Sequence, residues 1–316
     1  MDWKRYNNNL KKRFSKENLH REFNEIRKDT TKRDIFILLL LPIIATIIEL
    51  LPSDFQYVLR LNVQNPSWWQ FLTSAFTHQY FQHYFNNISL FLLLAFVQLV
   101  IASKMDVKKR YFYLLGITFF LLPILSSAYD VLYSAKLFTN MQTICGSSGI
   151  VSALLGFLPI MWMGYFSKSY GRKMVNLKLM LISMFYIGLL MLITYAFSTS
   201  IVQITIFSAA IVIFTYLYRK DLRYALKGIN EALRKNLILY YILITMPIFF
   251  IGTPLILFPI TLQQGGSGVD VIVHYIGAIF GCLLSYMFFR NLGAEKQPFS
   301  YHFKPKTGRF LDRFRM

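Results

Sequence analysis

The sequence predicts an all-α, polytopic membrane protein, a helical bundle with about eight transmembrane helices. Of its 316 residues, 55% are hydrophobic and only 16% are charged. Soluble domains carry about 25% charged residues, so this composition is unlike theirs. Long apolar runs also alternate with short basic segments along the chain, and a helix needs about 20 mostly apolar residues to cross the bilayer core.

Eight apolar segments are long enough to be assigned as transmembrane helices. They are Ile35–Leu51, Tyr84–Ser103, Tyr111–Ala128, Gly146–Phe166, Leu177–Phe197, Ile201–Tyr218, Leu237–Ile260 and Val271–Phe289. This assignment divides the chain into a basic N-terminal segment (1–33), a membrane domain (34–290) and a basic C-terminal tail (291–316).

The distribution of basic residues predicts the orientation of the bundle. All but two of the 34 Lys and Arg residues fall in the two terminal segments and in three of the connections between helices. Eight crossings place these five regions on one side, and only Arg60 and Lys136 on the other. By the positive-inside rule, the protein is a multi-pass cell-membrane protein with both termini in the cytoplasm. The net charge of +19 is thereby explained by topology, and no basic domain for nucleic acid is expected.

The N-terminal segment has two interpretations. Leu10, Phe14, Phe23 and Ile26 recur at roughly helical spacing among basic residues. This pattern fits a cytoplasmic helix that lies on anionic lipid of the bilayer. It fits equally a loosely ordered basic tail.

Polar residues gather at the outer ends of three predicted helices. His78, His83 and Asn87 open the second helix, and the last two share a helix face because they are four residues apart. Ionisable groups at the membrane are costly and are therefore candidates for function.

The fourth and eighth helices carry the remaining candidate residues. The fourth opens with Gly146-Ser147-Ser148-Gly149, so the Ser148 hydroxyl has room around it. The eighth carries His274, Gly277 and Gly281 on one face, and its two glycines allow close approach of another helix. These are the parts for acyl transfer: Ser148 as nucleophile, His274 as base, and the Ser148 N–H as one stabiliser of the oxyanion. His83 and Asn87 would supply further oxyanion donors.

Together these motifs resemble those of the rhomboid intramembrane serine proteases. His78, His83 and Asn87 match the family's His-x4-His-x3-Asn run, and Gly146 to Gly149 match its Gly-x-Ser-Gly. His274, Gly277 and Gly281 match its His-x2-Gly-x3-Gly. The resemblance implies a rhomboid-like core, a Ser–His dyad without a third catalytic acid, transmembrane protein substrates, and no metal or other cofactor. In it, His78 and the four motif glycines are supporting residues.

Three departures from the family pattern accompany these matches. Gln70 stands where the family often has Arg, which leaves the anchoring of the first loop open. Ser152 replaces a Tyr that packs against the catalytic His in many relatives. The interval from Ser148 to His274 is long, which indicates an added helical hairpin with a basic loop, around residues 177–235. We take 237–260 as the counterpart of the family's fifth helix, and the glycine-rich loop 263–270 as a cap over the site.

Other functional classes fit the sequence less well. A zinc protease would need a His-Glu-x-x-His motif, which the sequence lacks. An aspartyl intramembrane protease needs two carboxylates within the membrane, and the apolar runs contain only Glu49. A transporter would carry charges near mid-membrane. The serious alternative is a catalytically inactive rhomboid-like protein that binds transmembrane segments without cleaving them.

Overall fold

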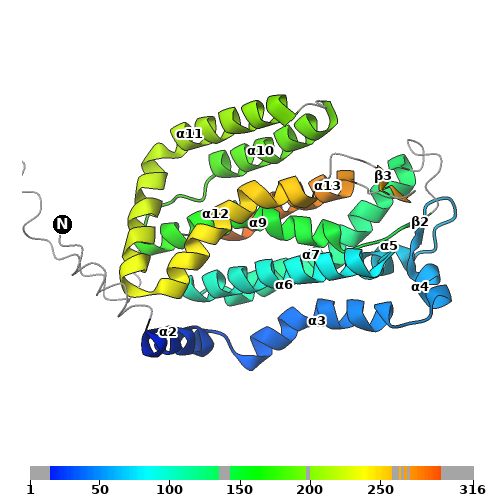
Figure 1. Cartoon of the computed structure of the whole chain (residues 1–316), viewed down its shortest axis with the longest axis horizontal. Helices are drawn as coiled ribbons and strands as arrows, with labels where there is room; N and C mark the ends of the chain where they lie inside the picture. Colours follow the sequence, from blue (N-terminus) through cyan, green and yellow to red (C-terminus); the bar gives the residue numbers. More distant parts are fainter. Residues whose placement is uncertain are drawn as a thin grey trace, which may run out of the picture.

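The computed structural model describes residues 15–134, 143–196, 200–257, 263–264, 267–268 and 271–292. Over these residues the chain forms an all-α bundle of long, roughly aligned helices (Figure 1). The longer helices are α2 (Lys16–Asp29), α3 (Lys32–Glu49), α6 (Phe81–Lys104), α7 (Lys108–Tyr129), α9 (Ser148–Tyr170), α10 (Leu177–Ala196), α11 (Ser200–Lys235), α12 (Leu237–Leu257) and α13 (Val271–Phe289). The all-α class of the prediction is thereby confirmed.

Short elements connect the long helices at the end where α9 begins. They are α4 (Ser53–Leu59), α5 (Gln70–Thr73), the 3-10 turn η1 (Ser74–Phe76) and the π-helical turn η2 (Asp130–Ser134). We call this the serine end of the bundle, after Ser148. The opposite end, where α9 ends and α10 and α12 begin, is the basic end.

Four of the described helices are long and apolar enough to cross a bilayer: α6, α7, α9 and α13. Shorter apolar stretches, 177–189 and 237–252, lie in α10 and α12. These lengths identify a helical membrane protein. The number of eight crossings and the direction in which the termini face stay predictions.

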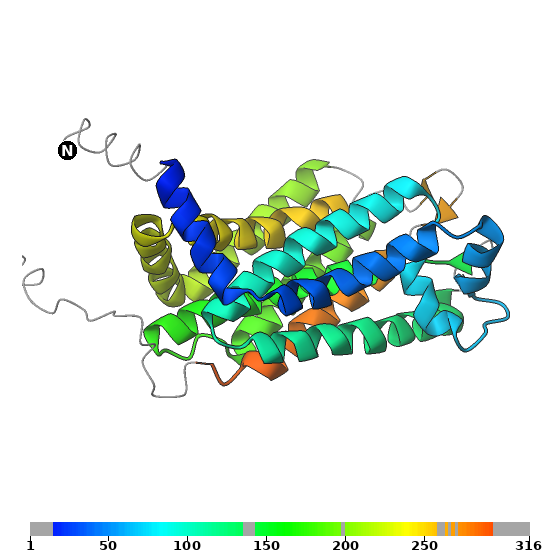
Figure 2. The ribbon, with the colours of Figure 1, turned by 90° about the horizontal axis from the view of Figure 1, so that it is seen from below.

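Helix α9 lies at the centre of the bundle (Figures 1 and 2). Almost its whole length is buried, and α6, α7, α12 and α13 pack around it. A helix that is apolar on all sides has no polar face to turn outward and is stable only inside such a bundle. This position makes the start of α9 accessible to residues from several other helices.

Helix α11 differs from the sequence prediction. The expected span 201–218 continues as helix through the segment predicted to be a basic loop, to Lys235. At about 1.5 Å per residue, its 36 residues extend about 54 Å, which exceeds the roughly 30 Å bilayer core. Figure 1 shows the helix turning across the basic end. There Asp221 forms an ion pair with Arg172 (3.2 Å), which lies just past the end of α9. This pair holds the second half of α11 against that end of α9.

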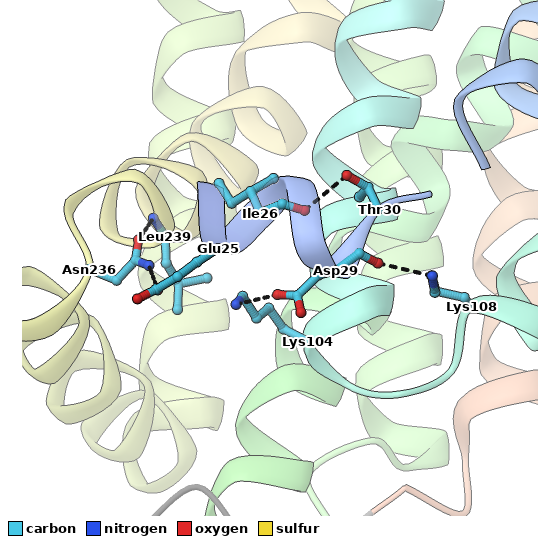
Figure 3. Close-up of polar contacts among 8 residues, drawn as sticks. All are labelled: Glu25, Ile26, Asp29, Thr30, Lys104, Lys108, Asn236 and Leu239. Atoms are coloured by element: carbon cyan, nitrogen blue, oxygen red, sulfur yellow. Dashed lines mark hydrogen bonds and ion pairs between the residues drawn. The ribbon is translucent and has the colours of Figure 1, made fainter. Parts of the chain in front are cut away.

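Helix α2 lies across the basic end and binds α6, α7 and α12 (Figure 3), with Lys108 of α7 donating to the Asp29 carbonyl (2.9 Å). Glu25 accepts a hydrogen bond from Asn236 Nδ2 (3.2 Å), and Asp29 pairs with Lys104. The buried Glu22 accepts from the backbone N–H groups of Leu237 (2.8 Å) and Ile238 (3.1 Å), the first residues of α12. The acidic face of α2 is therefore turned inward.

Of the two interpretations of the N-terminal segment, the structure has a helix at residues 16–29, and the apolar residues of this helix do not share one environment. Ile26 is buried against the bundle, whereas 58% of Phe23 is exposed. Leu10 and Phe14 lie outside the described residues. The inward bonds of the acidic residues fix which side faces the bundle, and apolar spacing alone does not contain that information.

Two short antiparallel strand pairs lie at the serine end. Strand β1 (Leu61–Asn62) pairs with β2 (Thr143–Ile144), with Leu61 opposite Ile144. Strand β3 (Gln263–Gln264) pairs with β4 (Ser267–Gly268) inside the loop predicted to be a cap. The other residues of that loop, including Gly266, lie outside the described residues, as does the tail beyond residue 292.

Candidate functional site

The segment just before α9 is held in place by backbone pairing. Strand β2 ties Ile144 to the first loop through β1, and the Gly146 N–H donates to the Ser74 carbonyl (2.9 Å). Gly146 has a φ of +129°, a conformation that residues with a side chain rarely adopt. The chain then turns directly into α9.

Ser148 is the first residue of α9 and is partly exposed. The N–H groups of a first helical turn have no partner within the helix, so they are ready donors to an anion. The side chain of the N-cap residue Ser147 makes no capping bond to this terminus. The hydroxyl and the N–H of Ser148 thus lie at an uncapped, electropositive helix end.

His78 binds Ser147. Its Nε2 lies 3.1 Å from the Ser147 hydroxyl and accepts from the Ser147 N–H (3.4 Å). A ring nitrogen that accepts from an N–H carries no proton, so the imidazole is neutral with its proton on Nδ1. Burial lowers the pKa of His78 to about 3, helped by His83 and Arg60. A supporting role, as the resemblance implies, fits this position.

His83 and Asn87 approach the same segment from α6. A Cβ on Gly146 would lie 2.8 Å from Cε1 of His83, so this imidazole occupies the space next to Gly146. Asn87, one turn further along α6, is buried, and its Nδ2 has no partner among the described residues. A buried amide donor without a partner costs stability, which is a reason to expect that a ligand uses it.

The glycines of α13 bring this helix into direct backbone contact with α9. A Cβ on Gly277 would lie 2.2 Å from the Gly149 carbonyl oxygen, and one on Gly281 would lie 2.1 Å from that of Ala153. The contact continues one turn further, where Cys282 Sγ donates to the Gly156 carbonyl (3.2 Å). The predicted packing role of both glycines is confirmed.

His274 lies in the first turn of α13 and is 5% exposed. Its neighbour Val273 and the following Gly277 both lie against Gly149. The turn of α13 that carries His274 therefore packs against the turn of α9 that carries Ser148. The structure thus brings five of the predicted residues to one end of the pair α9 and α13, or to the loop that leads into α9. They are Gly146, Ser148, Gly149, His274 and Gly277.

Gln70 takes over the anchoring of the first loop. Its Oε1 accepts from the N–H groups of Asn62 (3.2 Å) and Ser67 (3.1 Å), and its Nε2 donates to the Val58 carbonyl (3.0 Å). Three bonds from one neutral amide hold the loop that includes β1. The first loop is therefore anchored by a neutral side chain at the position where the resemblance suggested Arg.

Ser152 leaves an unusual environment beside α13. It is fully buried, its Cβ lies 3.2 Å from where a Cβ on Gly277 would be, and its hydroxyl has no partner among the described residues. A Tyr here would need the space that α13 now fills. At this position the site therefore contains a small, buried hydroxyl.

Sequence reasoning missed Arg60 and the strand pair. The Arg60 guanidinium donates to the His78 carbonyl (2.8 Å) and thereby links the first loop to the histidine motif. The only signal for it was its position as one of two basic residues on the serine side. Within the described residues, no three His, Cys, Asp or Glu side chains lie close enough together to hold a metal ion.

Comparison of the chain with protein-family models, with curated proteins and with solved structures found no match. The resemblance to rhomboid proteases is accordingly carried by the three motifs alone.

Proposed function

We propose that the protein is an intramembrane serine endopeptidase of the rhomboid type, which cleaves a peptide bond in or near a substrate's transmembrane helix. The observation that carries the proposal is the glycine contact between α9 and α13. It packs the turn of His274 against the turn of Ser148, at an uncapped helix end. Two helices in ordinary contact would hold the base further from the hydroxyl.

In the proposed reaction, Ser148 Oγ attacks the scissile carbonyl carbon while His274 takes the hydroxyl proton. The resulting oxyanion accepts hydrogen bonds from the Ser148 N–H, from His83 and from Asn87 Nδ2. When the intermediate collapses, the C–N bond breaks and His274 protonates the leaving amine. A water molecule, deprotonated by His274, then releases the acyl product from Ser148.

The proposed substrate is a transmembrane segment that unwinds locally, because the scissile carbonyl of an intact helix is shielded by its neighbours. Small, helix-breaking residues at the cleavage site are therefore expected. The proposal includes a rhomboid-like core, eight crossings, an added hairpin formed by α10 and α11, and cytoplasmic termini. In this orientation Ser148 lies near the outer face of the cell membrane.

The test compares Ser148→Ala with Ser169→Ala in reconstituted vesicles that contain a model transmembrane substrate. Both serines lie on α9, but Ser169 is at its opposite end and bonds only the Tyr165 carbonyl among the described contacts. We expect Ser148→Ala to lower cleavage by about 10⁴-fold or more, and Ser169→Ala to leave it near wild type. Wild-type cleavage by the Ser148→Ala protein would refute the proposal.

The alternative is an inactive rhomboid-like protein that binds transmembrane segments. The observation that favours it is Ser152, which gives His274 no aromatic ring at that position. Labelling by a fluorophosphonate probe separates the two functions, because only an activated serine reacts. Labelling that is lost in both Ser148→Ala and His274→Ala supports the enzyme, and no labelling of folded wild type supports the binder.

A further inference from the structure

An apolar cavity of about 170 Å³ lies between α9, α10, α11 and α12, on the side of α9 away from α13. Its walls include Pro159 and Trp162 of α9, Tyr186 of α10, Phe214 of α11, and Met246 and Pro247 of α12. An apolar cavity of about 150 Å³ stays dry and takes up molecules such as benzene. This cavity is therefore large enough for a segment of a hydrocarbon chain.

Pro247 leaves one backbone carbonyl near the cavity wall without its helical partner. Pro247 has no N–H, so the carbonyl of Leu243, four residues earlier, loses its helical partner. Trp162 supplies a replacement, because its indole N–H donates to that carbonyl (2.8 Å). The Tyr186 hydroxyl donates to the Ile251 carbonyl (3.3 Å). The polar groups of both rings are thus satisfied by backbone, and the cavity presents an apolar lining.

Thr215 is the one residue of the cavity lining that is exposed, so we place the opening of the cavity beside it. Its neighbours Val212 and Ile213 are also exposed, at 66% and 54%. In a membrane, an exposed apolar surface of this kind faces lipid chains, so the molecules that meet the opening are lipids.

Basic residues lie on the same face of α11, just beyond the opening. Arg219 is four residues after Thr215 and Arg223 is four further, so both follow Thr215 toward the basic end. Across from them on α10, Lys178 donates to the Leu217 carbonyl (3.1 Å) and lies 5.3 Å from the centre of the Tyr218 ring. Tyr218 in turn stacks on Phe214, which lines the cavity.

The apolar wall thus leads directly to a cationic rim. In α9, α10 and α12, Trp162, Tyr186 and Met246 each lie eight or nine residues from the helix terminus at the basic end. At about 1.5 Å per residue this is about 12 to 14 Å, the depth of a fatty acyl chain in one leaflet. A cation at the interface with an acyl-sized cavity beneath it matches the two parts of an anionic phospholipid.

From this arrangement we infer that the cavity binds an acyl chain of an anionic phospholipid from the leaflet at the basic end, whose phosphate lies at Lys178 and Arg219. The site is separate from the serine end and does not rest on the proposed protease activity. It also assigns a role to the added hairpin, because α10 and α11 supply both the basic rim and five of the twelve residues that line the cavity.

The test uses the fluorescence of Trp162, which is buried in the cavity wall. The protein is reconstituted in phosphatidylcholine with increasing fractions of phospholipid brominated at mid-chain, either phosphatidylglycerol or phosphatidylcholine. The signal of Trp162→Phe is subtracted so that Trp3, Trp68 and Trp69 do not contribute. We expect brominated phosphatidylglycerol to reach half-maximal quenching of Trp162 at about one fifth of the mole fraction that brominated phosphatidylcholine needs, or at a still lower fraction. One basic residue near an anionic headgroup contributes about this factor.

Two pairs of variants complete the test. Thr215→Phe closes the opening and should lower the quenching of Trp162 by both brominated lipids, whereas Val212→Phe, on the neighbouring surface, should not. Arg219→Gln should reduce the preference for phosphatidylglycerol several-fold, whereas Lys109→Gln, an exposed residue of α7, should leave it unchanged. Equal quenching by the two lipids in wild type, or quenching that Thr215→Phe leaves unchanged, would show only surrounding lipid and overturn the inference.

Discussion

At the scale of single residues, Asn87 is the side chain whose environment most calls for a ligand. It is buried on α6 one turn from His83, and its amide Nδ2 has no partner among the described residues. If it stabilises an oxyanion, Asn87→Ala should lower kcat by about 100- to 1,000-fold with little change in KM, because the bond forms only in the transition state.

The matched control for this prediction is Gln82→Ala. Gln82 lies on the exposed side of α6, where its side chain bonds only to Asn86 among the described contacts (2.7 Å). Cleavage kinetics of the two variants on the same substrate provide the measurement. An equal and small effect of both substitutions would mean that the amide of Asn87 takes no part in the reaction.

His78 makes the stability of the serine end depend on pH. Burial lowers its pKa to about 3, from a value of 6.5 in an exposed chain. Between these values the unfolded chain binds a proton that the folded chain does not, so stability is lost as pH falls from 6.5 toward 3. The loss approaches about 1.4 kcal/mol per pH unit.

We therefore expect the unfolding temperature in detergent to fall between pH 7 and pH 4, and to fall less steeply in His78→Asn. His20→Asn, on the exposed surface of α2, is the control and should keep the wild-type slope. Parallel slopes for wild type and His78→Asn would mean that His78 does not become harder to protonate on folding.

At the scale of the elements, the close contact between α9 and α13 depends on Gly277 and Gly281 of α13 and on Gly156 of α9. A methyl group on Gly281 would lie 2.1 Å from the Ala153 carbonyl oxygen, so the helices must separate to admit it. We expect Gly281→Ala to lower the unfolding temperature by several degrees and to abolish cleavage, because His274 would move away from Ser148. Overpacking of this kind costs about 1–3 kcal/mol.

Gly116→Ala on α7 is the matched substitution, because a Cβ there meets nothing within 4 Å. It should be neutral or slightly stabilising, as alanine favours helix more than glycine. Thermal unfolding and cleavage of the two variants give the comparison. A Gly281→Ala protein with wild-type stability would show that the two helices have room to adjust.

The helices also show which structural features a sequence pattern can predict. Each of the eight apolar segments forms a helix over most of its described residues, because length and hydropathy are local properties that a single segment carries. The glycine stripe was predictable for the same reason. The continuation of α11 past Tyr218 was not, because its basic residues indicate a position outside the bilayer and say nothing about whether the backbone remains helical.

Contacts between distant segments could not be predicted from the sequence either. Glu22 accepts from the first N–H groups of α12, 215 residues further along the chain, and nothing in either segment identifies the partner. The same holds for Arg60 with His78 and for β1 with β2. The motif residues could be named from spacing, but the loop and strand contacts that position them depend on the assembled bundle.

At the scale of the whole molecule, the distribution of charge predicts the side of the membrane on which each end lies. The basic end gathers Arg and Lys from several connections, and the serine end carries Arg60 as its basic residue among the described ones. Single cysteines at the exposed positions Asn65 and Lys173 probe the two ends. In intact cells, Asn65→Cys should react with a membrane-impermeant maleimide, and Lys173→Cys should react only after the membrane is opened.

The two native cysteines are suitable as background for this experiment. Burial raises the pKa of Cys145 to about 11, so little reactive thiolate is present at pH 7, and Cys282 is fully buried. The wild-type protein should therefore stay unlabelled in both conditions. Labelling of Lys173→Cys in intact cells, with Asn65→Cys protected, would mean that the orientation is opposite to the predicted one. Ser148 would then lie in the cytoplasmic half of the membrane.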